Sequence, residues 1–168
     1  MYACGPYTTQ KSLSYLPLKE LLKKAKEEQP HVLILSGPFV DMANEDVNNC
    51  HLIFKVDGSE DMQFATFEDL FQDLMRQVDR ELQGVHVVIA PSHKEVHHFF
   101  PMPQPAFPST LLPKNLRNKF TLTPNPSLLC LNELTVAFSS LDSLKELLQN
   151  MVVKSPQESG SKIDLALH

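Results

Sequence analysis

Residues 91–98, PSHKEVHH, carry side chains suited to metal chemistry. Three of the chain's seven histidines fall in this segment, beside one glutamate. Imidazole and carboxylate groups bind transition-metal ions, and such ions activate water for hydrolysis. The candidate ligands are His93, Glu95, His97 and His98.

The spacing of these residues argues against a metal centre. Zinc enzymes use defined motifs such as HExxH, which places two histidines on one face of a helix. Residues 93–98 contain no such motif, and the sequence Phe99-Phe100-Pro101 directly after them opposes a helix. We favour a packed loop in which the imidazoles hydrogen-bond to neighbouring backbone groups.

Composition indicates a single globular domain. The chain has 168 residues, of which 42% are hydrophobic and 21% charged, enough for one domain with a core. Its net charge is −5, and its richest basic stretch, residues 19–29, interleaves lysines with glutamates. Binding to nucleic-acid phosphates needs clustered Lys and Arg, so we expect the chain by itself to bind DNA weakly.

Apolar patterning predicts two buried strands, each preceded by a helix. Residues 17–29 keep apolar side chains on one helical face, and the apolar run HVLILS, residues 31–36, follows. A start resembling a capping box at Thr66 opens a second helix, with Gly84 as its expected C-cap, before VHVVIA, residues 85–90. Helix and strand therefore alternate, which predicts an α/β fold with parallel neighbouring strands.

Loops rich in small residues and proline follow the predicted strands. CGPYTT comes after the opening Tyr2-Ala3, SGPFVD after the first apolar run and PSHKEVHH after the second. Ligand-facing loops of open α/β sheets emerge at the carboxyl ends of strands, so we expect these three loops to lie side by side. Beyond them the sequence predicts a proline-rich connection over residues 101–113, a hairpin over residues 127–140 and a last helix starting near Leu141.

The three loops stand where a calcineurin-like metallophosphoesterase holds its metals. Such an enzyme needs Asp and His after the first strand, Gly-Asp after the second, and Gly-Asn-His with an acid after the third. The corresponding residues here are Cys4, Gly5 and Pro6, then Gly37 and Pro38, then Pro91, Ser92 and His93. Carboxylates and imidazoles are missing at the first two places, and Lys94 would repel a cation at the third. We therefore expect a chain that is not an enzyme and uses no metal or cofactor.

The substituted pattern resembles the B subunits of DNA polymerase alpha. ACGPYTT, VLILSGPFVD followed by VNNC, and PSHKEVHH followed by PMPQPAF occur in the family's order and at family-like spacing, from Ala3 to about Leu144. The resemblance implies a non-catalytic accessory subunit of the polymerase alpha–primase complex, built on an inactive calcineurin-like two-sheet sandwich flanked by helices. It also implies a nuclear protein that binds the carboxy-terminal domain of the catalytic subunit, meets primase through the complex and touches DNA only indirectly.

Family members extend beyond this sequence at both ends, so the resemblance implies only the N-terminal half of the sandwich. The expected organisation is a partial, inactive phosphoesterase-like domain over residues 1–153 and a flexible tail over residues 154–168. A fragment, a truncated gene model and a degenerate paralogue all fit this pattern. The alternative function is a metal-dependent phosphoesterase or nuclease, which the missing ligands oppose.

Several residues of these loops have two interpretations. Asp41 could be a vestigial ligand, but we favour capping of the short helix expected after it. Cys4 could be a nucleophile, but we favour a small buried hydrophobe. The prolines of residues 101–108 could form a polyproline ligand, and we favour a stiff internal connection. The candidate partner contacts are Phe99, Phe100 and Phe107, which flank those prolines.

Overall fold

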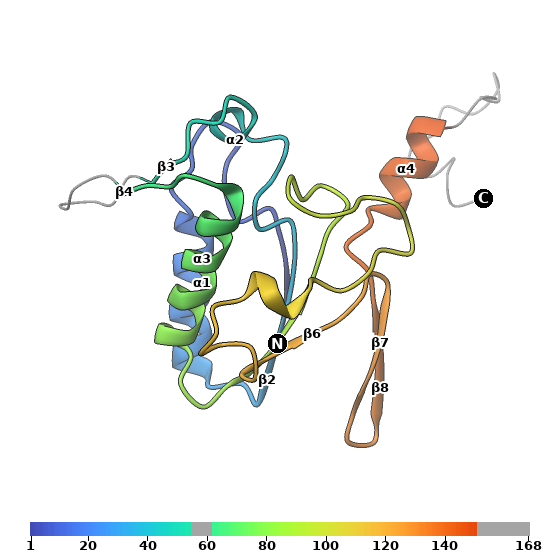
Figure 1. Ribbon diagram of the computed structural model, residues 1–168. Helices are drawn as coiled ribbons and strands as arrows, with labels where there is room; N and C mark the ends of the chain where they lie inside the picture. Colours follow the sequence, from blue (N-terminus) through green and yellow to red (C-terminus); the bar gives the residue numbers. More distant parts are fainter. Residues whose placement is uncertain (55–61, 151–168) are drawn as a thin grey trace.

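The computed structural model describes residues 1–54 and 62–150. In chain order its elements are β1 (Tyr2–Cys4), α1 (Leu16–Glu28), β2 (Val32–Ser36), α2 (Glu45–Asn48), β3 (Ile53–Phe54), β4 (Met62–Gln63), α3 (Phe67–Glu81), β5 (His86–Ala90), the 3-10 helix η1 (Ser109–Leu111), β6 (Phe120–Leu122), β7 (Ser127–Leu131), β8 (Leu134–Phe138) and α4 (Ser143–Asn150). Figure 1 shows α1 and α3 side by side on one side of the central strands, the β7–β8 hairpin on the other side, and α4 projecting away from both.

A four-stranded parallel sheet with the order β1-β2-β5-β6 organises the chain. In its register Ile34 stands opposite both Tyr2 and Val88, and Val88 stands opposite Thr121. The two strands predicted from apolar runs, β2 and β5, are parallel neighbours, which confirms the α/β expectation. The other two strands, β1 and β6, are short and form the edges.

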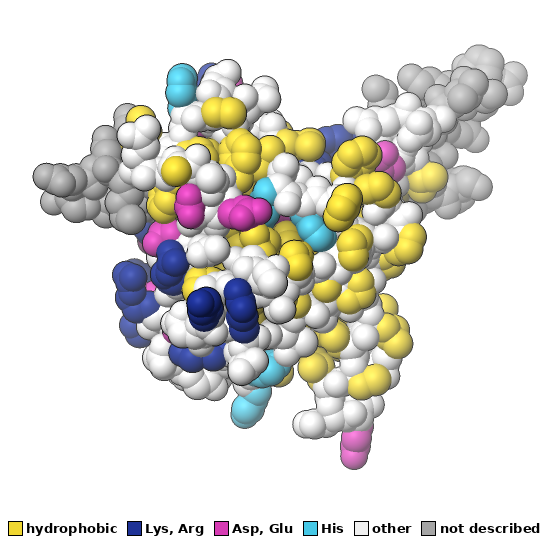
Figure 2. Space-filling model, in the orientation of Figure 1, with side chains coloured by type: hydrophobic (Ala, Val, Ile, Leu, Met, Phe, Trp, Pro, Cys, Tyr) yellow, Lys and Arg dark blue, Asp and Glu magenta, His cyan; other side chains and the backbone are white. Residues whose placement is uncertain are grey.

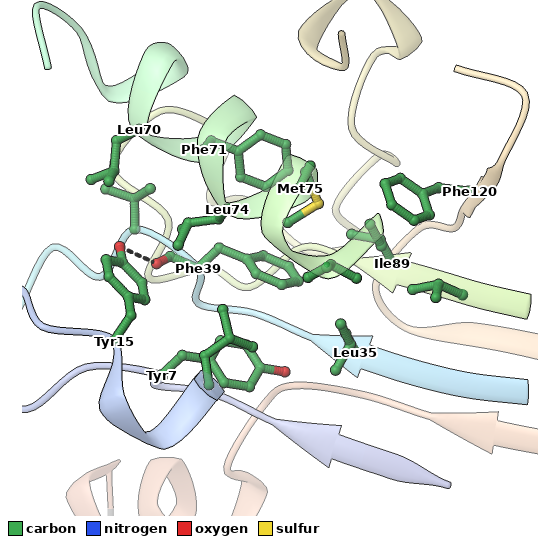
Figure 3. Close-up of a cluster of buried hydrophobic side chains, with 14 of the residues drawn as sticks. Tyr7, Tyr15, Leu35, Phe39, Leu70, Phe71, Leu74, Met75, Ile89 and Phe120 are labelled. Carbon is green, nitrogen blue, oxygen red and sulfur yellow. Dashed lines mark hydrogen bonds between the residues drawn. The ribbon is translucent and has the colours of Figure 1, made fainter. Parts of the chain in front are cut away.

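The main hydrophobic core lies between this sheet and the two long helices. Strand residues Leu35 and Ile89 point toward the same side as the apolar stripe of α3 (Figure 3). That stripe is fully buried and consists of Leu70, Phe71, Leu74, Met75 and Val78. Burying one such side chain contributes roughly 1.5–3 kcal/mol, so this stripe fixes α3 on the sheet.

Local signals start and stop the helices. The Thr66 hydroxyl accepts a hydrogen bond from the backbone N–H of Asp69 at 3.1 Å, as the capping pattern predicts. The helix ends at Glu81 with Leu82 as its C-cap, so the prediction that Gly84 caps it was wrong. Gly84 instead has a φ of 85° in the turn that follows, a conformation that suits glycine.

The second face of the sheet is covered differently. Ile34 and Val88 are buried there, on the same side as Tyr2, and the ring of Tyr2 lies 5.9 Å from that of Phe138 in β8. The hairpin of β7 and β8 is antiparallel, as predicted, and its inward residues are half-buried. Its outward residues include Leu128, which is 67% exposed.

The carboxy-terminal helix α4 has no buried residue. It begins at Ser143, two residues after the predicted start, and its leucines Leu144 and Leu147 are exposed. The predicted flexible tail, residues 154–168, lies outside the described residues. The short β3–β4 pair, which the sequence did not predict, encloses residues 55–61, which also lie outside them.

No helix within residues 1–54 and 62–150 is long and apolar enough to cross a membrane.

Candidate functional site

The loops after β1, β2 and β5 lie side by side at the carboxyl edge of the sheet, as predicted. The backbone N–H of Gly5 donates to the carbonyl of Ser36 at 2.8 Å. The N–H of Gly37 donates in turn to the carbonyl of Ala90 at 2.9 Å. The sheet's ladder therefore continues into the loops and brings segments together that are far apart in sequence.

The glycines of the first two loops sit where no side chain fits. A Cβ on Gly5 would lie 2.5 Å from the carbonyl oxygen and 2.8 Å from the nitrogen of Pro38. A Cβ on Gly37 would collide with the carboxyl group of Glu95 and approach the nitrogen of Ser92 to 3.1 Å. The loops are packed so closely that only glycine fits at these two positions.

The carboxyl group of Glu95 ties the second and third loops together. Its two oxygens accept hydrogen bonds from the backbone N–H groups of Phe39, at 2.6 Å, and Val40, at 3.0 Å. Around it the two loops pair as backbone: Val96 donates to the carbonyl of Val40 at 3.1 Å, and Met42 donates to that of Lys94 at 3.0 Å. Glu95 is therefore a buried cross-link between loops.

Burial controls the protonation of this group and its neighbour. Removal from water raises the pKa of Glu95 to about 8, with the two backbone hydrogen bonds opposing the rise. Burial likewise lowers the pKa of His97 to about 4. The Nδ1 atom of His97 lies 3.9 Å from Glu95 Oε2, within ion-pair distance, yet both groups are uncharged at neutral pH because neither can be solvated.

The three histidines of this segment have different surroundings. His98 Nε2 lies 2.8 Å from the carbonyl oxygen of Pro105, which matches the predicted bond to backbone. The Nδ1 atom of His93 and both ring nitrogens of His97 are buried without a hydrogen-bond partner in the structure, so that prediction was wrong for them. The ring of His97 instead stacks on Phe107, with centroids 5.7 Å apart and planes 7° apart.

Two further expectations about single residues need correction. Asp41 does not cap the short helix: Asn44 does, by accepting from the N–H groups of Asp46 and Val47. The Asp41 carboxylate accepts from the N–H of Ala43 at 3.0 Å within the preceding turn. Cys4 is exposed rather than buried, with its Sγ 3.5 Å from the Gly37 carbonyl oxygen.

Phe107 is also corrected, because it belongs to the core. It is 2% exposed and packs against Phe71 at a centroid distance of 4.9 Å. The other two candidate contacts, Phe99 and Phe100, are 72% and 69% exposed. Only these two remain available to a partner.

The site contains residues that sequence reasoning missed. Tyr7 and Tyr15 are buried, and their hydroxyls donate to the carbonyls of Ser36, at 2.9 Å, and Phe39, at 2.8 Å (Figure 3 shows the second bond). Buried Gln104 and Asn125 pair through backbone bonds of 2.7 and 2.9 Å, and the side-chain amide of Gln104 donates to the carbonyl of Ser92 in the third loop at 2.9 Å. A buried tyrosine hydroxyl needs a hydrogen-bond acceptor, and this requirement was the one sequence signal for the roles of Tyr7 and Tyr15.

A cavity of about 540 Å³ opens over the three loops. The first, second and third loops line one side, and the segment from Ser139 to Gln149 lines the other. Its charged groups are two lysines, Lys94 and Lys145, and two carboxylates, Asp142 and Glu146. The lining therefore carries charges of both signs.

Within the described residues, no three His, Cys, Asp or Glu side chains stand close enough together to share a metal ion. Glu95 is the one carboxylate of the third loop, and its oxygens are taken by backbone N–H groups. The hydrogen bonds of Glu95 therefore hold the second and third loops together.

The match to a family model covers nearly the whole chain. Residues 1–166 match the family of the B subunits of DNA polymerases alpha and epsilon. The chain belongs to this family. The three loops and their glycines are thus the loops of a polymerase B-subunit chain.

Curated relatives agree with this assignment. The B subunit of DNA polymerase alpha from Rattus norvegicus is 35% identical over 146 residues, which is 86% of this chain and 22% of that protein. The protein of the same name from Dictyostelium discoideum is 32% identical over 158 residues, 92% of this chain and 23% of that protein. The chain spans about a fifth of the length of the curated relatives it matches.

Proposed function

We propose that this chain is part of a non-catalytic accessory subunit that acts in DNA replication by holding the catalytic subunit of DNA polymerase alpha. Through that subunit it would meet primase, and it would act in the nucleus. Membership of the B-subunit family supports the accessory role. The bound region of the catalytic subunit would be its carboxy-terminal domain.

One observation carries the non-catalytic part of the proposal. A metallophosphoesterase needs carboxylates and imidazoles whose lone pairs face the metals. Here the carboxyl group of the third loop is buried, uncharged at neutral pH and bonded to the backbone of the second loop. The place of a ligand is taken by a structural cross-link, which fits a degenerate calcineurin-like fold.

The exposed half of the hairpin supports a second part of the proposal, that this chain is the N-terminal half of a two-sheet sandwich. A sandwich sheet buries one face against a second sheet. The outward face of β7–β8 keeps Leu128 exposed, and the longer relatives have chain in which further strands would lie.

Capture by the catalytic subunit tests the scaffold. The carboxy-terminal domain of that subunit is immobilised, and the chain is pulled down as wild type, as the double variant Phe99→Ala/Phe100→Ala, and as His93→Ala. We expect the double variant to lose roughly tenfold or more in capture, because exposed aromatic side chains are typical interface anchors. We expect His93→Ala to bind like wild type, since its ring lies in a loop that holds structure. Circular dichroism first establishes that each variant is folded.

The reverse result would overturn the assignment. Full capture of the double variant, with loss on His93→Ala, would make the loop of residues 91–98 the functional site. Manganese-dependent hydrolysis of a chromogenic phosphodiester, abolished by His93→Ala and His97→Ala together, would establish the alternative phosphoesterase or nuclease.

A further inference from the structure

A groove of about 690 Å³ runs beside the two exposed phenylalanines. Residues 96–100 form one part of its lining, Glu68 from the first turn of α3 joins them, and the rest comes from Pro105, Ala106, Pro108 and Leu111. Pockets of roughly 300–1,000 Å³ hold drug-sized ligands, so this groove has room for apolar side chains of a partner. Figure 2 shows acidic and histidine side chains at the border of a hydrophobic area on this face of the molecule.

The phenylalanine side of the groove is held in place by buried polar groups. The side-chain amide of Gln104 donates to the carbonyl of Phe99 and, at 2.9 Å, to that of Ser92. The backbone of Gln104 pairs in both directions with that of Asn125, and His98 bonds to the carbonyl of Pro105. A groove fixed in this way loses little conformational entropy when a partner enters.

The interior of the groove is mostly apolar. His97 contributes to its lining, and its ring packs between Phe71, at a centroid distance of 5.1 Å, and Phe107. Burial lowers the pKa of His97 to about 4, so the ring carries no charge at neutral pH. Val96 and Leu111 complete a lining that fits an aliphatic or aromatic side chain.

The rim of the groove is acidic. Glu68 is exposed, and it forms no ion pair with any residue in the described part of the chain. Among the described residues that line the groove, Glu68 is the one acidic residue. A carboxylate at the edge of an apolar groove favours a cation on the partner and disfavours an anion.

We propose that this groove docks a short protein segment that presents an apolar anchor side chain next to a lysine or arginine, with the anchor between Phe99, Phe100 and the groove interior and the cation at Glu68. If the segment belongs to the catalytic subunit, that assignment rests on the proposed function. The sequence chemistry of the segment follows from the groove itself.

Fluorescence anisotropy with model peptides tests this inference. Three short fluorescein-labelled peptides share one backbone sequence: the first carries a leucine pair and adjacent lysines, the second has glutamates in place of the lysines, and the third has serines in place of the leucines. Each is titrated with wild-type chain, Glu68→Lys, Phe99→Ser/Phe100→Ser and, as a matched charge control, Glu27→Lys. Glu27 is likewise exposed, on α1 and outside the groove.

We expect the lysine peptide to bind wild-type chain roughly tenfold more tightly than the glutamate peptide, as a charge pair at an interface rim permits. Glu68→Lys should shrink that ratio to about twofold or less, and Glu27→Lys should leave it unchanged. The serine peptide and the phenylalanine double variant should both lose binding. Equal affinities for the lysine and glutamate peptides, or a ratio that Glu27→Lys reduces as much as Glu68→Lys, would overturn the inference.

The pull-down separates this result from the proposed function. If the peptides discriminate as expected but the catalytic subunit's domain is not captured, the docking chemistry stands and the partner is another protein. If that domain is captured but the peptides do not discriminate, the scaffold stands and the groove is not its docking site.

Discussion

Two regions of this molecule differ in how far their leucine side chains are buried. Leu74 on α3 is completely buried between helix and sheet, whereas Leu128 on β7 is 67% exposed on the outward face of the hairpin. The first region, the sheet with α1 and α3, has a core whose apolar side chains are buried. The second region, the hairpin with α4, keeps apolar side chains in contact with water. Exposed apolar patches often mark interfaces, which is the basis of our proposal that further chain covers the second region.

Truncation of matched leucines in the two regions should give the largest difference in stability. Leu74→Ala should lower the free energy of unfolding by about 2–5 kcal/mol, because it removes packed atoms and leaves a cavity. Leu128→Ala should change it by about 0.5 kcal/mol or less, since the side chain is already in water. Urea unfolding of both variants measures this, and similar losses would erase the distinction between the regions.

A methyl group at the loop junction should cost nearly as much. Gly5→Ala places a Cβ 2.5 Å from the backbone oxygen of Pro38, and backbone cannot move aside without disturbing β1 and β2. We expect a loss of roughly 1–3 kcal/mol in the free energy of unfolding. Gly84→Ala is the control: nothing lies within 4 Å of its Cβ, so its loss of about 1 kcal/mol reflects positive φ alone. A Gly5→Ala variant as stable as wild type would show that the loops have room for a side chain at this position.

Asn125 joins the two regions, and its removal should affect them unequally. Its side chain bonds to Ser140 through both the amide nitrogen, at 2.6 Å to the hydroxyl, and the oxygen, at 3.1 Å from the backbone N–H. Asn125→Ala should cost about 1–3 kcal/mol, because the partly buried Ser140 and the buried Gln104 lose hydrogen bonds. Hydrogen exchange should quicken most in β7, β8 and α4, while the exposed control Asn115→Ala leaves exchange unchanged. Equal quickening in α3 would mean that the regions unfold as one unit.

The last effect concerns pH and belongs to the first region alone. A carboxyl group whose pKa is raised in the folded state stabilises the fold below its unfolded pKa and loses that contribution as pH rises through its folded pKa. For Glu95, with a folded pKa of about 8, wild type should lose roughly 2 kcal/mol between about pH 6.5 and 8.5. Glu95→Gln should remove that loss while keeping an acceptor for a backbone N–H.

The pH window separates this effect from that of His97. The lowered pKa of His97 acts only below its unfolded value of about 6.5, where stability falls as pH decreases. Thermal melts of wild type and Glu95→Gln across the alkaline window provide the measurement. Parallel pH profiles for the two proteins would contradict the buried, protonated carboxyl.

What could be foreseen from the sequence differs between elements for physical reasons. The strands β2 and β5 and the helix α3 were predicted, because apolar runs, periodicity and a cap are local signals. The part played by Glu95 was not, because it depends on Phe39 and Val40, which reach it only through the folded sheet. Likewise Phe99, Phe100 and Phe107 look equivalent in sequence, and only packing against Phe71 and His97 places the last in the core.

The parallel sheet has a consequence for the order of events during folding. Tyr2 pairs with Ile34, Ile34 with Val88, and Val88 with Thr121, so each ladder joins residues separated by a long intervening stretch of chain. Every pairing must therefore close a large loop and lose chain entropy before its stabilising contacts form. Folding through such non-local pairings is slow. During synthesis the sheet cannot be completed until β6 has left the ribosome, and until then the apolar strands β2 and β5 are open to wrong partners.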